Sequence, residues 1–396
     1  MKPNRHCMVV HAYYPLGETR VERQALALVD NGIDVDIICL KSKNDPSESV
    51  VGGANVIRLP VNRHKDSGAI VQIIEYLSFF ILAFIRLSSL YFQRRYNIIQ
   101  VHNLPDFLVF VGIIPKLFGA KIILDLHDLM PEFYAERFSK SIRSVPVRLI
   151  ILQERLSCHF ADHIITVTEF WRQSLIERGQ PSEKITVVMN VADSRFFNRD
   201  ISTSKSSTDR FRLIYHGIMG KRHGLDLVLE AIKSISKTIP NLSFILHGSG
   251  EYRKTLEKMV LEMDLKEIVR FSFKFMPTDE LAIWISEADL GIVPYRDDIF
   301  TGGILPTKLM EYAALGIPAI ASCTETISSY FDDSMVEFFT PGDVNDLASK
   351  IEKLYKDRER LSDLARNITK FNEQYNWPSQ STFYLQLIYH LTGIDA

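Results

Sequence analysis

The stretch YRDDIFTGGILPTKLMEYAALGIPAIAS, residues 295–322, predicts a glycine-containing loop, a helix and a buried strand in succession. Pro306 suits a first helical turn, and Gly316 is a typical helix end. The start of such a helix offers unpaired N–H groups and a positive dipole to phosphate, and Lys308 adds a full positive charge there. Glu311 follows on the same face, about 4.5 Å further along the axis. This spacing suits a diphosphate followed by a ribose; the alternative is a solvated pair on an ordinary amphipathic helix.

On both sides of this stretch, short apolar runs alternate with longer amphipathic segments. The alternation is typical of parallel strands joined by crossover helices, so the predicted fold class is α/β. The chain has 396 residues and 46% apolar content, which is enough for two hydrophobic cores. The predicted strands are 8–11, 35–39, 56–58, 98–102, 122–126, 164–167 and 186–189 in the first half, and 212–215, 242–247, 269–273, 290–293 and 319–322 in the second.

A polar linker and a C-terminal helix divide the predicted fold. Residues 200–209, DISTSKSSTD, are rich in Ser and Thr and lack large apolar side chains, which indicates an exposed connection. We therefore expect one doubly wound domain at 1–195 and a second at 196–372. Residues 373–396 predict an amphipathic helix that packs back on the first domain. Its apolar residues at helical spacing are Phe383, Leu387 and Leu391.

Charge, cysteine content and the start of the sequence argue against several protein classes. The 46 basic and 48 acidic side chains are mixed along the chain and give a formal net charge of -2, so no general attraction to nucleic acid is expected. The four cysteines are far apart, which argues against a disulfide framework or a structural zinc site and fits a reducing cytosol. The first residues lack the layout of a cleavable secretion signal.

The segment 70–95 allows two interpretations. Its longest apolar run, 76–85, is too short to cross a bilayer, which needs about 20 apolar residues, so we expect no membrane-spanning helix. Because predicted strands bracket the segment, a core helix is the favoured interpretation. Peripheral contact with anionic lipid is the alternative, since aromatic and basic residues occur together. These residues are Phe79, Phe80, Phe84, Arg86, Tyr91, Arg94 and Arg95.

The helix after the glycine pair resembles the donor-site motif P-x-K-x-x-E-Y-x-A-x-G-x-P of family 4 retaining glycosyltransferases, the group 1 glycosyltransferases of GT-B fold. The matching residues are Pro306, Lys308, Glu311, Tyr312, Ala314, Gly316 and Pro318. The resemblance implies two facing Rossmann-like domains with a cleft between them, the first on the acceptor side and the second binding a nucleotide sugar. It also implies retention of anomeric configuration, with UDP the most typical carrier.

The chain departs from the family pattern beside this helix. Many members carry a second glutamate where this chain has Gly303. The backbone of the glycine pair, or Asp297 and Asp298, would have to replace it. By resemblance, the predicted donor-binding residues are Gly17, Gly217, Gly248, Gly302, Gly303, Ile304, Leu305, Thr307 and Glu311.

A second departure lies in GIMGKRHG, residues 217–224. Members commonly place an arginine and a lysine here against the diphosphate, but Ile218 and His223 take those positions. Arg222 or Lys221 is the expected substitute, because arginine suits a bidentate phosphate contact. A solvated basic turn is the alternative.

The first domain offers LDLHDLMPEFY, residues 124–134, which follows an apolar strand. His127 should emerge at the carboxyl end of that strand, where open α/β sheets bind ligands. The stretch resembles the family pattern H-D-x-x-P-E, which implies sugar contact; a structural histidine is the alternative. The predicted catalytic residues are His127, Arg222 and Lys308. The predicted acceptor-side residues are His102, Asn103, Asp128 and Glu132, although caps and local turns explain such residues equally well.

The combined prediction is transfer of a sugar from a nucleotide diphosphate to a glycan or lipid-linked acceptor. No cofactor and no metal are expected, because no D-x-D-type carboxylate pair stands in a matching context, and no nucleic-acid partner is expected. A nucleotide-sugar epimerase and a catalytically silent subunit remain alternatives. The expected location is the cytoplasm, with the inner face of the plasma membrane as a further hypothesis.

Overall fold

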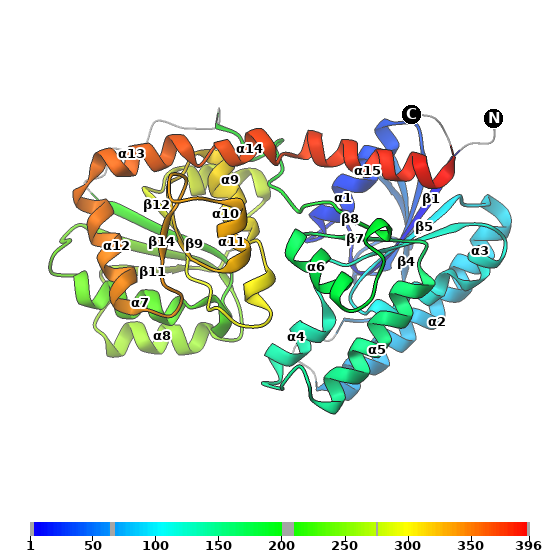
Figure 1. Cartoon of the computed structure of the whole chain (residues 1–396), viewed down its shortest axis with the longest axis horizontal. Coiled ribbons are helices and arrows are strands. Elements are labelled where there is room, and N and C mark those ends of the chain that lie inside the picture. The colour runs from blue at the N-terminus through cyan, green and yellow to red at the C-terminus, as the bar shows by residue number, and fades with distance from the viewer. Residues whose placement is uncertain (1–3, 64–67, 200–209, 275, 394–396) are drawn as a thin grey trace. The chain divides into compact units, whose positions relative to one another are not determined.

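The computed structural model describes residues 4–63, 68–199, 210–274 and 276–393 (Figure 1). The chain forms two compact units: unit 1 comprises Met1–Asn190 with Gln380–Ala396, and unit 2 comprises Val191–Ser379. The first boundary thus lies after residue 190 rather than 195, and the second falls inside the last helix rather than at 372. The linker predicted at 200–209 lies outside the described residues.

Unit 1 is built on an eight-stranded sheet in the order β3-β4-β2-β1-β5-β6-β7-β8. The strands are β1 (Arg5–Tyr13), β2 (Asp34–Leu40), β3 (Glu48–Val51), β4 (Ala54–Leu59), β5 (Ile98–His102), β6 (Lys121–Asp125), β7 (His163–Thr166) and β8 (Ile185–Val187). Among the described strands, neighbours run parallel except β3 and β4, which form a hairpin. Gly52 and Gly53 turn this hairpin with positive φ angles, which glycine adopts without steric cost.

Helices cover both faces of this sheet. On one face, α1 (Thr19–Asp30) and α15 (Trp377–Thr392) share a core with β1 and β2. On the other face, α2 (Ala69–Arg94) packs against His11 of β1 through Phe79, and η1 (Asp106–Gly112) contacts both α2 and α5 (Val145–Phe160). Figure 1 shows α15 in red beside the strands of unit 1. The remaining helices are α3 (Ile113–Leu117), α4 (Met130–Arg137), α6 (Glu169–Glu177) and η2 (Ser182–Lys184).

Unit 2 is built on a six-stranded parallel sheet in the order β11-β10-β9-β12-β13-β14. Its strands are β9 (Phe211–Ile218), β10 (Leu242–Ser249), β11 (Val269–Ser272), β12 (Leu290–Val293), β13 (Ala319–Ser322) and β14 (Glu337–Phe339). Counted from β9, this is the strand order 3-2-1-4-5-6 of a doubly wound dinucleotide-binding fold. The predicted second doubly wound domain is therefore confirmed.

Two layers of helices cover the sheet of unit 2. On one face, α7 (Leu225–Ile235), α8 (Arg253–Glu262) and α12 (Val344–Lys356) bury apolar side chains against the strands. On the other face, α10 (Thr307–Leu315) lies against β12 so closely that a Cβ at Gly291 would sit 2.5 Å from the Tyr312 ring. The other helices are η4 (Lys221–His223), α9 (Thr278–Ser286), η5 (Thr301–Gly303), α11 (Glu325–Tyr330), α13 (Arg358–Asn367) and α14 (Lys370–Gln374).

Each predicted strand is present, while β3 and β14 were missed. The last helix packs on unit 1 as predicted, but the buried stripe is shifted. Tyr384, Leu387 and Ile388 lie in the core, and the Tyr384 hydroxyl donates to the Gln100 side-chain oxygen at 2.7 Å. Phe383, which was expected in the core, is exposed.

For segment 70–95, the premise that the apolar stretch is too short to span a bilayer was wrong, and so was the favoured core-helix interpretation. The helix α2 has 26 residues, and Ile70–Arg94 is long and apolar enough to cross a membrane by length and composition, with a mean hydropathy of 1.9 over its most apolar 18 residues. Glu75 and Arg86 interrupt the apolar run in the sequence without ending the helix. Nor is α2 a core helix, because only 22% of its most apolar 18-residue window is buried.

Candidate functional site

Each sheet has a point where the strand order reverses, and ligands of doubly wound folds bind beside that point at the carboxyl ends of the strands. In unit 2 the reversal lies between β9 and β12, and in unit 1 between β1 and β5. The predicted residues Gly217, His102 and His127 lie at, or just after, strand ends near these reversals. The two units therefore each present a candidate half-site.

In unit 2, Lys308 is the central residue of the half-site. Its ammonium group is buried and donates a hydrogen bond to the Tyr295 hydroxyl at 2.6 Å. It also lies 4.9 Å from the centre of the Tyr215 ring. A Cβ at Gly217 would lie only 3.7 Å from Lys308 Nζ, so the lysine reaches the end of β9. The helix start and the glycine loop, 91 positions apart in the chain, thus meet as predicted.

Glu311 is fixed by a neighbour that the sequence analysis did not single out. Its carboxylate contacts His216 Nε2, and His216 Nδ1 lies 3.2 Å from the Tyr312 hydroxyl. The Glu311 side chain remains 19% exposed, so it is both oriented and accessible. A carboxylate held in this way can accept charge-assisted hydrogen bonds from a pair of hydroxyl groups.

The glycines of unit 2 allow backbone segments to approach closely. Gly217 and Gly248 are paired in the sheet and have φ angles of 115° and 130°. A Cβ at Gly248 would lie 2.0 Å from the Gly217 carbonyl oxygen, so no side chain fits there. These glycines therefore shape the floor of the half-site through the path of the backbone.

The loop after β9 carries the predicted basic residue. The Arg222 guanidinium stacks over the Phe300 ring at 5.3 Å, which anchors it beside η5. His223 is buried and accepts a hydrogen bond from the Gly220 N–H at Nδ1. Burial, together with Lys308 and Arg222, lowers the pKa of His223 to about 2, so it is neutral. Ile218 is exposed.

The segment before α10 is tightly structured. Gly302 and Gly303 are buried in η5, and Asp298 accepts hydrogen bonds from the N–H groups of Phe300 and Thr301. Asp298 therefore serves as a turn cap, which leaves Asp297 beside Gly302 as the nearer carboxylate. Ile304 and Leu305 lead into α10, whose first residue Thr307 is exposed. Pro306 provides no side-chain cap, so the N–H groups of this helix start are available to a ligand.

In unit 1, the half-site is organised around Asp125, the last residue of β6, which is fully buried. Arg20 donates to its carboxylate from both Nε and Nη2, the latter at 2.8 Å, and Gln24 and Gln100 donate at 3.0 and 3.1 Å. Burial would raise the pKa of Asp125, but Arg20 and two nearby histidines hold it well below its usual value. Arg20 is thus an internal counter-ion of Asp125.

His127 and His102 lie together beside Asp125. His127 Nε2 is 3.1 Å from His102 Nδ1, and His102 is in sheet register with Asp125. Burial lowers the pKa of His127 to about 3, and Arg20 and His102 add to this despite Asp125. His127 is therefore neutral at physiological pH, with a partly exposed side chain that can exchange hydrogen bonds with a ligand.

Asn103 ties the two loops of this half-site together. Its side-chain amide donates to Asp106 and to the Asp128 carbonyl, while its oxygen accepts from the His127 N–H at 2.8 Å. Asn103 thereby fixes the position of His127 and Asp128, which is a positioning role rather than the acceptor contact predicted for it. The predicted residue Gly17 lies in an open, exposed turn with φ of 84°.

Glu132 is placed differently from its prediction. Its carboxylate is buried and pairs with Arg178, which also binds Glu154 at 2.8 Å. Glu132 thus holds α4 to the loop after α6 inside unit 1. The H-D-x-x-P-E pattern therefore supplies a ligand-facing histidine and an internal ion pair.

Three side chains of unit 1 could offer ligands to a metal ion. Nitrogen and oxygen atoms of His102, Asp125 and His127 all lie within 4.8 Å of one another. The Arg20 guanidinium already occupies the Asp125 carboxylate and brings a positive charge to the same place. The guanidinium would repel a metal cation, so His102, Asp125 and His127 fit a hydrogen-bonded network better than a metal centre.

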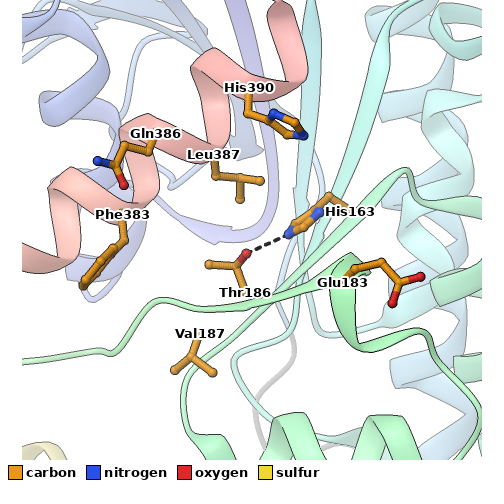
Figure 2. A pocket seen from close by; sticks show the side chains of 8 residues that line it. All are labelled: His163, Glu183, Thr186, Val187, Phe383, Gln386, Leu387 and His390. Atoms are coloured by element: carbon orange, nitrogen blue, oxygen red, sulfur yellow. Dashed lines mark hydrogen bonds between the residues drawn. The ribbon is translucent and has the colours of Figure 1, made fainter. Parts of the chain in front are cut away.

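A separate hollow of about 510 Å³ lies in unit 1 between β7, β8 and α15 (Figure 2). His163 and Thr186 are hydrogen-bonded at 2.8 Å on its wall, and Phe383 and His390 line it from α15. His163 is the first residue of β7, at the opposite end of the strand from the half-site. None of the predicted site residues lines this hollow.

Several site residues were missed by the sequence analysis. Tyr295, His216 and Asp125 contact the predicted residues but carry no motif of their own. Each lies within two residues of the carboxyl end of a strand, so its position relative to the strand ends was the available signal.

The protein has two doubly wound domains, and the second carries a lysine and a carboxylate near the start of one helix, spaced for a diphosphate and a ribose. These features define a nucleotide-sugar-binding GT-B protein. Models of two families cover most of the chain: the glycosyl transferase 4-like domain matches residues 17–190, and the glycosyl transferases group 1 match residues 197–371. The chain belongs to the group 1, or family 4, glycosyltransferases.

The chain is also similar to individual glycosyltransferases and to solved structures. The amylovoran biosynthesis glycosyltransferase AmsK of Erwinia amylovora is 24% identical over 48% of this chain. The chain spans about half the length of the first curated relatives that it matches, 47% in the case of AmsK. Sucrose-phosphate synthase of Thermosynechococcus elongatus superposes with a TM-score of 0.79 at 19% identity, covering 98% of this chain and 99% of that one. Anabaena Alr3699/HepE in complex with UDP-glucose has a TM-score of 0.72 at 15% identity, with 97% and 99% covered.

Proposed function

We propose that this protein is a retaining, metal-independent hexosyltransferase that transfers a sugar from a UDP-sugar to a hydroxyl group of a glycan or lipid-linked acceptor. The observation that carries the proposal is the pairing of Lys308 with Tyr295 and of Glu311 with His216 on one face of α10. These contacts hold a cation and a carboxylate at the spacing of a diphosphate and a ribose. The proposed sugar transfer takes place in the cytoplasm, as a step of polysaccharide or glycoconjugate synthesis.

The donor is bound mainly by unit 2. Glu311 accepts hydrogen bonds from the ribose hydroxyls, and the N–H groups at the start of α10 receive the diphosphate. Lys308 and Arg222 supply positive charge that stabilises the leaving group as negative charge builds on it. The solved complex of HepE with UDP-glucose supports UDP as the carrier, and the name of AmsK supports a role in polysaccharide synthesis.

In the proposed step, the bond between the anomeric carbon and the diphosphate oxygen breaks, and a bond from the acceptor oxygen to that carbon forms on the same face. The acceptor proton passes to the departing diphosphate, so the products are UDP and the glycosylated acceptor. His127, neutral and partly exposed, forms a hydrogen bond with the sugar but neither gives up nor takes up a proton in this step. Because arginine and lysine provide the positive charge, activity should persist in a chelator such as EDTA.

The test is calorimetric titration of the protein with UDP and with GDP. We expect micromolar binding of UDP and a loss of at least about tenfold in the Glu311→Ala variant, because two charge-assisted hydrogen bonds are removed. Glu267→Ala, at an exposed position of unit 2, is the matched control. Preference for GDP would contradict the proposed carrier, and absence of binding to either nucleotide would favour a catalytically silent subunit.

Turnover separates the transferase from an epimerase of similar architecture. Incubation with a UDP-hexose alone should give at most slow hydrolysis. Incubation with the UDP-hexose and the acceptor should give UDP together with a glycosylated product that keeps the anomeric configuration. Conversion of the donor sugar into an epimer without acceptor would contradict the proposal.

A further inference from the structure

The outer surface of unit 1 is unusually apolar along α2. Ile70, Ile73, Leu77, Ile81 and Ile85 recur at helical spacing and are exposed, Ile70 by 75% and Ile85 by 60%. The inner stripe of the same helix is buried and includes Phe79, Leu87 and Tyr91. An exposed aliphatic stripe about 22 Å long, at 1.5 Å per residue, is far larger than the scattered apolar residues of an ordinary surface.

A second helix extends this surface. On α5 the exposed residues include Val145, Leu149, Leu152 and Leu156, again at helical spacing, with Leu149 exposed by 61%. Ring contacts join the two helices through η1: Phe80 of α2 lies 6.0 Å from Phe107, and Phe110 lies 5.1 Å from Phe160 of α5. Figure 1 shows α2 and α5 on the same side of unit 1. We call this surface, made by the outer residues of α2 and α5, the apolar face.

The exposed charges of α5 and of the segment before it have one sign. The exposed charged residues of the segment that leads into and along α5 are Arg137, Lys140, Arg143, Arg148 and Arg155. The acid in the same helix, Glu154, points inward to Arg178, and the acid of α2, Glu75, points inward to His11 at 3.2 Å. α5 therefore directs its acid to the core and Arg148 and Arg155 outward, and α2 directs Glu75 to the core, while Arg86 of α2 pairs with the exposed Glu48.

We infer that the apolar face docks unit 1 on an anionic lipid bilayer. Aliphatic side chains would enter the boundary between headgroups and acyl chains, and the basic residues would bind anionic headgroups. This rests on the outer residues of α2 and α5 and not on the proposed donor chemistry. It revises the interpretation of 70–95, because the lipid-facing residues are aliphatic and the aromatic residues Phe79 and Tyr91 face the core.

Two other arrangements fit the structure less well. If α2 crossed the bilayer, β4 and β5 at its two ends would lie on opposite sides, yet both belong to the same sheet. If a second copy covered the apolar face about a two-fold axis, the same basic residues would meet across the interface and repel one another. A helix lying on the surface with a basic rim avoids both conflicts.

The experiment is flotation of the full chain with phosphatidylcholine vesicles that contain about one third phosphatidylglycerol, compared with pure phosphatidylcholine. We expect binding to the anionic vesicles that weakens as salt is added, because the basic rim is exposed and screened. Arg148→Gln/Arg155→Gln should weaken binding roughly 25-fold, at about fivefold for each arginine.

Variants of the apolar stripe test the other half of the inference. Leu149→Glu/Leu152→Glu and Ile81→Glu/Ile85→Glu should each lower the vesicle-bound fraction at least about tenfold. Leu261→Glu/Ile283→Glu, at exposed apolar positions of unit 2, is the matched control and should bind like the wild type. Equal binding by all variants would overturn the inference, as would a dimer in light scattering that only the unit 1 substitutions dissociate. UDP titration of the same variants, expected to be unchanged, keeps this test separate from that of the proposed function.

Discussion

The two half-sites use charge in opposite ways. In unit 1, the Asp125 carboxylate is enclosed by Arg20, Gln24 and Gln100, and the adjacent His127 is kept neutral. In unit 2, Glu311 is held by a histidine, and Lys308 is held by the Tyr295 hydroxyl and lies against the Tyr215 and Tyr295 rings; in the described residues these contacts of Lys308 include no acid. The difference indicates that unit 1 contributes a rigid shape and neutral donors, while unit 2 contributes the net charge that chemistry on a diphosphate requires.

This contrast predicts that the largest effect on folding comes from unit 1. Asp125→Asn leaves the Arg20 guanidinium, which is 4% exposed, without its counter-ion. Removing one partner of a buried ion pair costs about 3–5 kcal/mol, so we expect a loss of this size in the free energy of unfolding of unit 1. Hydrogen exchange of peptides from β5 and β6 would measure it.

Asp226→Asn in unit 2 is the matched control. Asp226 is buried but pairs with Arg296, whose side chain is 32% exposed, so water hydrates the guanidinium that is left without a partner and a cost of about 1 kcal/mol is expected. Equal losses for the two variants would break the proposed contrast between a closed network in unit 1 and an open one in unit 2.

The next largest effect should be on turnover and should come from unit 2. Lys308→Met keeps the length of the side chain but removes the charge that faces the leaving diphosphate. We expect kcat to fall by about 10²–10³, as when one preorganised transition-state contact is deleted, with little change in folding. Steady-state assays and a thermal melt would measure both quantities. Lys258→Met, on the exposed surface of α8, is the control; a loss of folding equal to the loss of activity would give Lys308 a structural role.

The fold was largely predictable because its signal is local. Alternating apolar runs predicted each strand of 4 or more residues except the edge strand β3, whose side chains are only half-buried or exposed. The strand β14 was missed because it has three residues, one of them a buried glutamate paired with Lys353. The apolar stretch of α2 was judged too short to span a bilayer because Glu75 interrupts it, although the Glu75 side chain points inward to His11.

The site was predictable only where its residues share one element. Lys308 and Glu311 are three positions apart on α10, so helical geometry sufficed. Their partners are distant in sequence: His216 lies 95 positions from Glu311, and Arg20 lies 105 positions from Asp125. Such pairs arise from the order of strands in the sheet, and a single sequence carries no pattern that joins them.

The smallest predicted effect concerns the neutral histidine of unit 1. The folded-state pKa of His127 is about 3, against 6.5 for an unperturbed histidine. Between these values the unfolded chain binds a proton that the folded chain does not, so His127 costs stability as the pH falls below 6.5. His127→Gln removes this cost, and its stability relative to the wild type should rise by about 1.4 kcal/mol per pH unit between about 6 and 4. Urea unfolding at pH 7, 6 and 5 would measure the difference, with His159→Gln as the exposed control. A difference that stays constant with pH would show that His127 is protonated inside unit 1, and the half-site would then carry positive charge as unit 2 does.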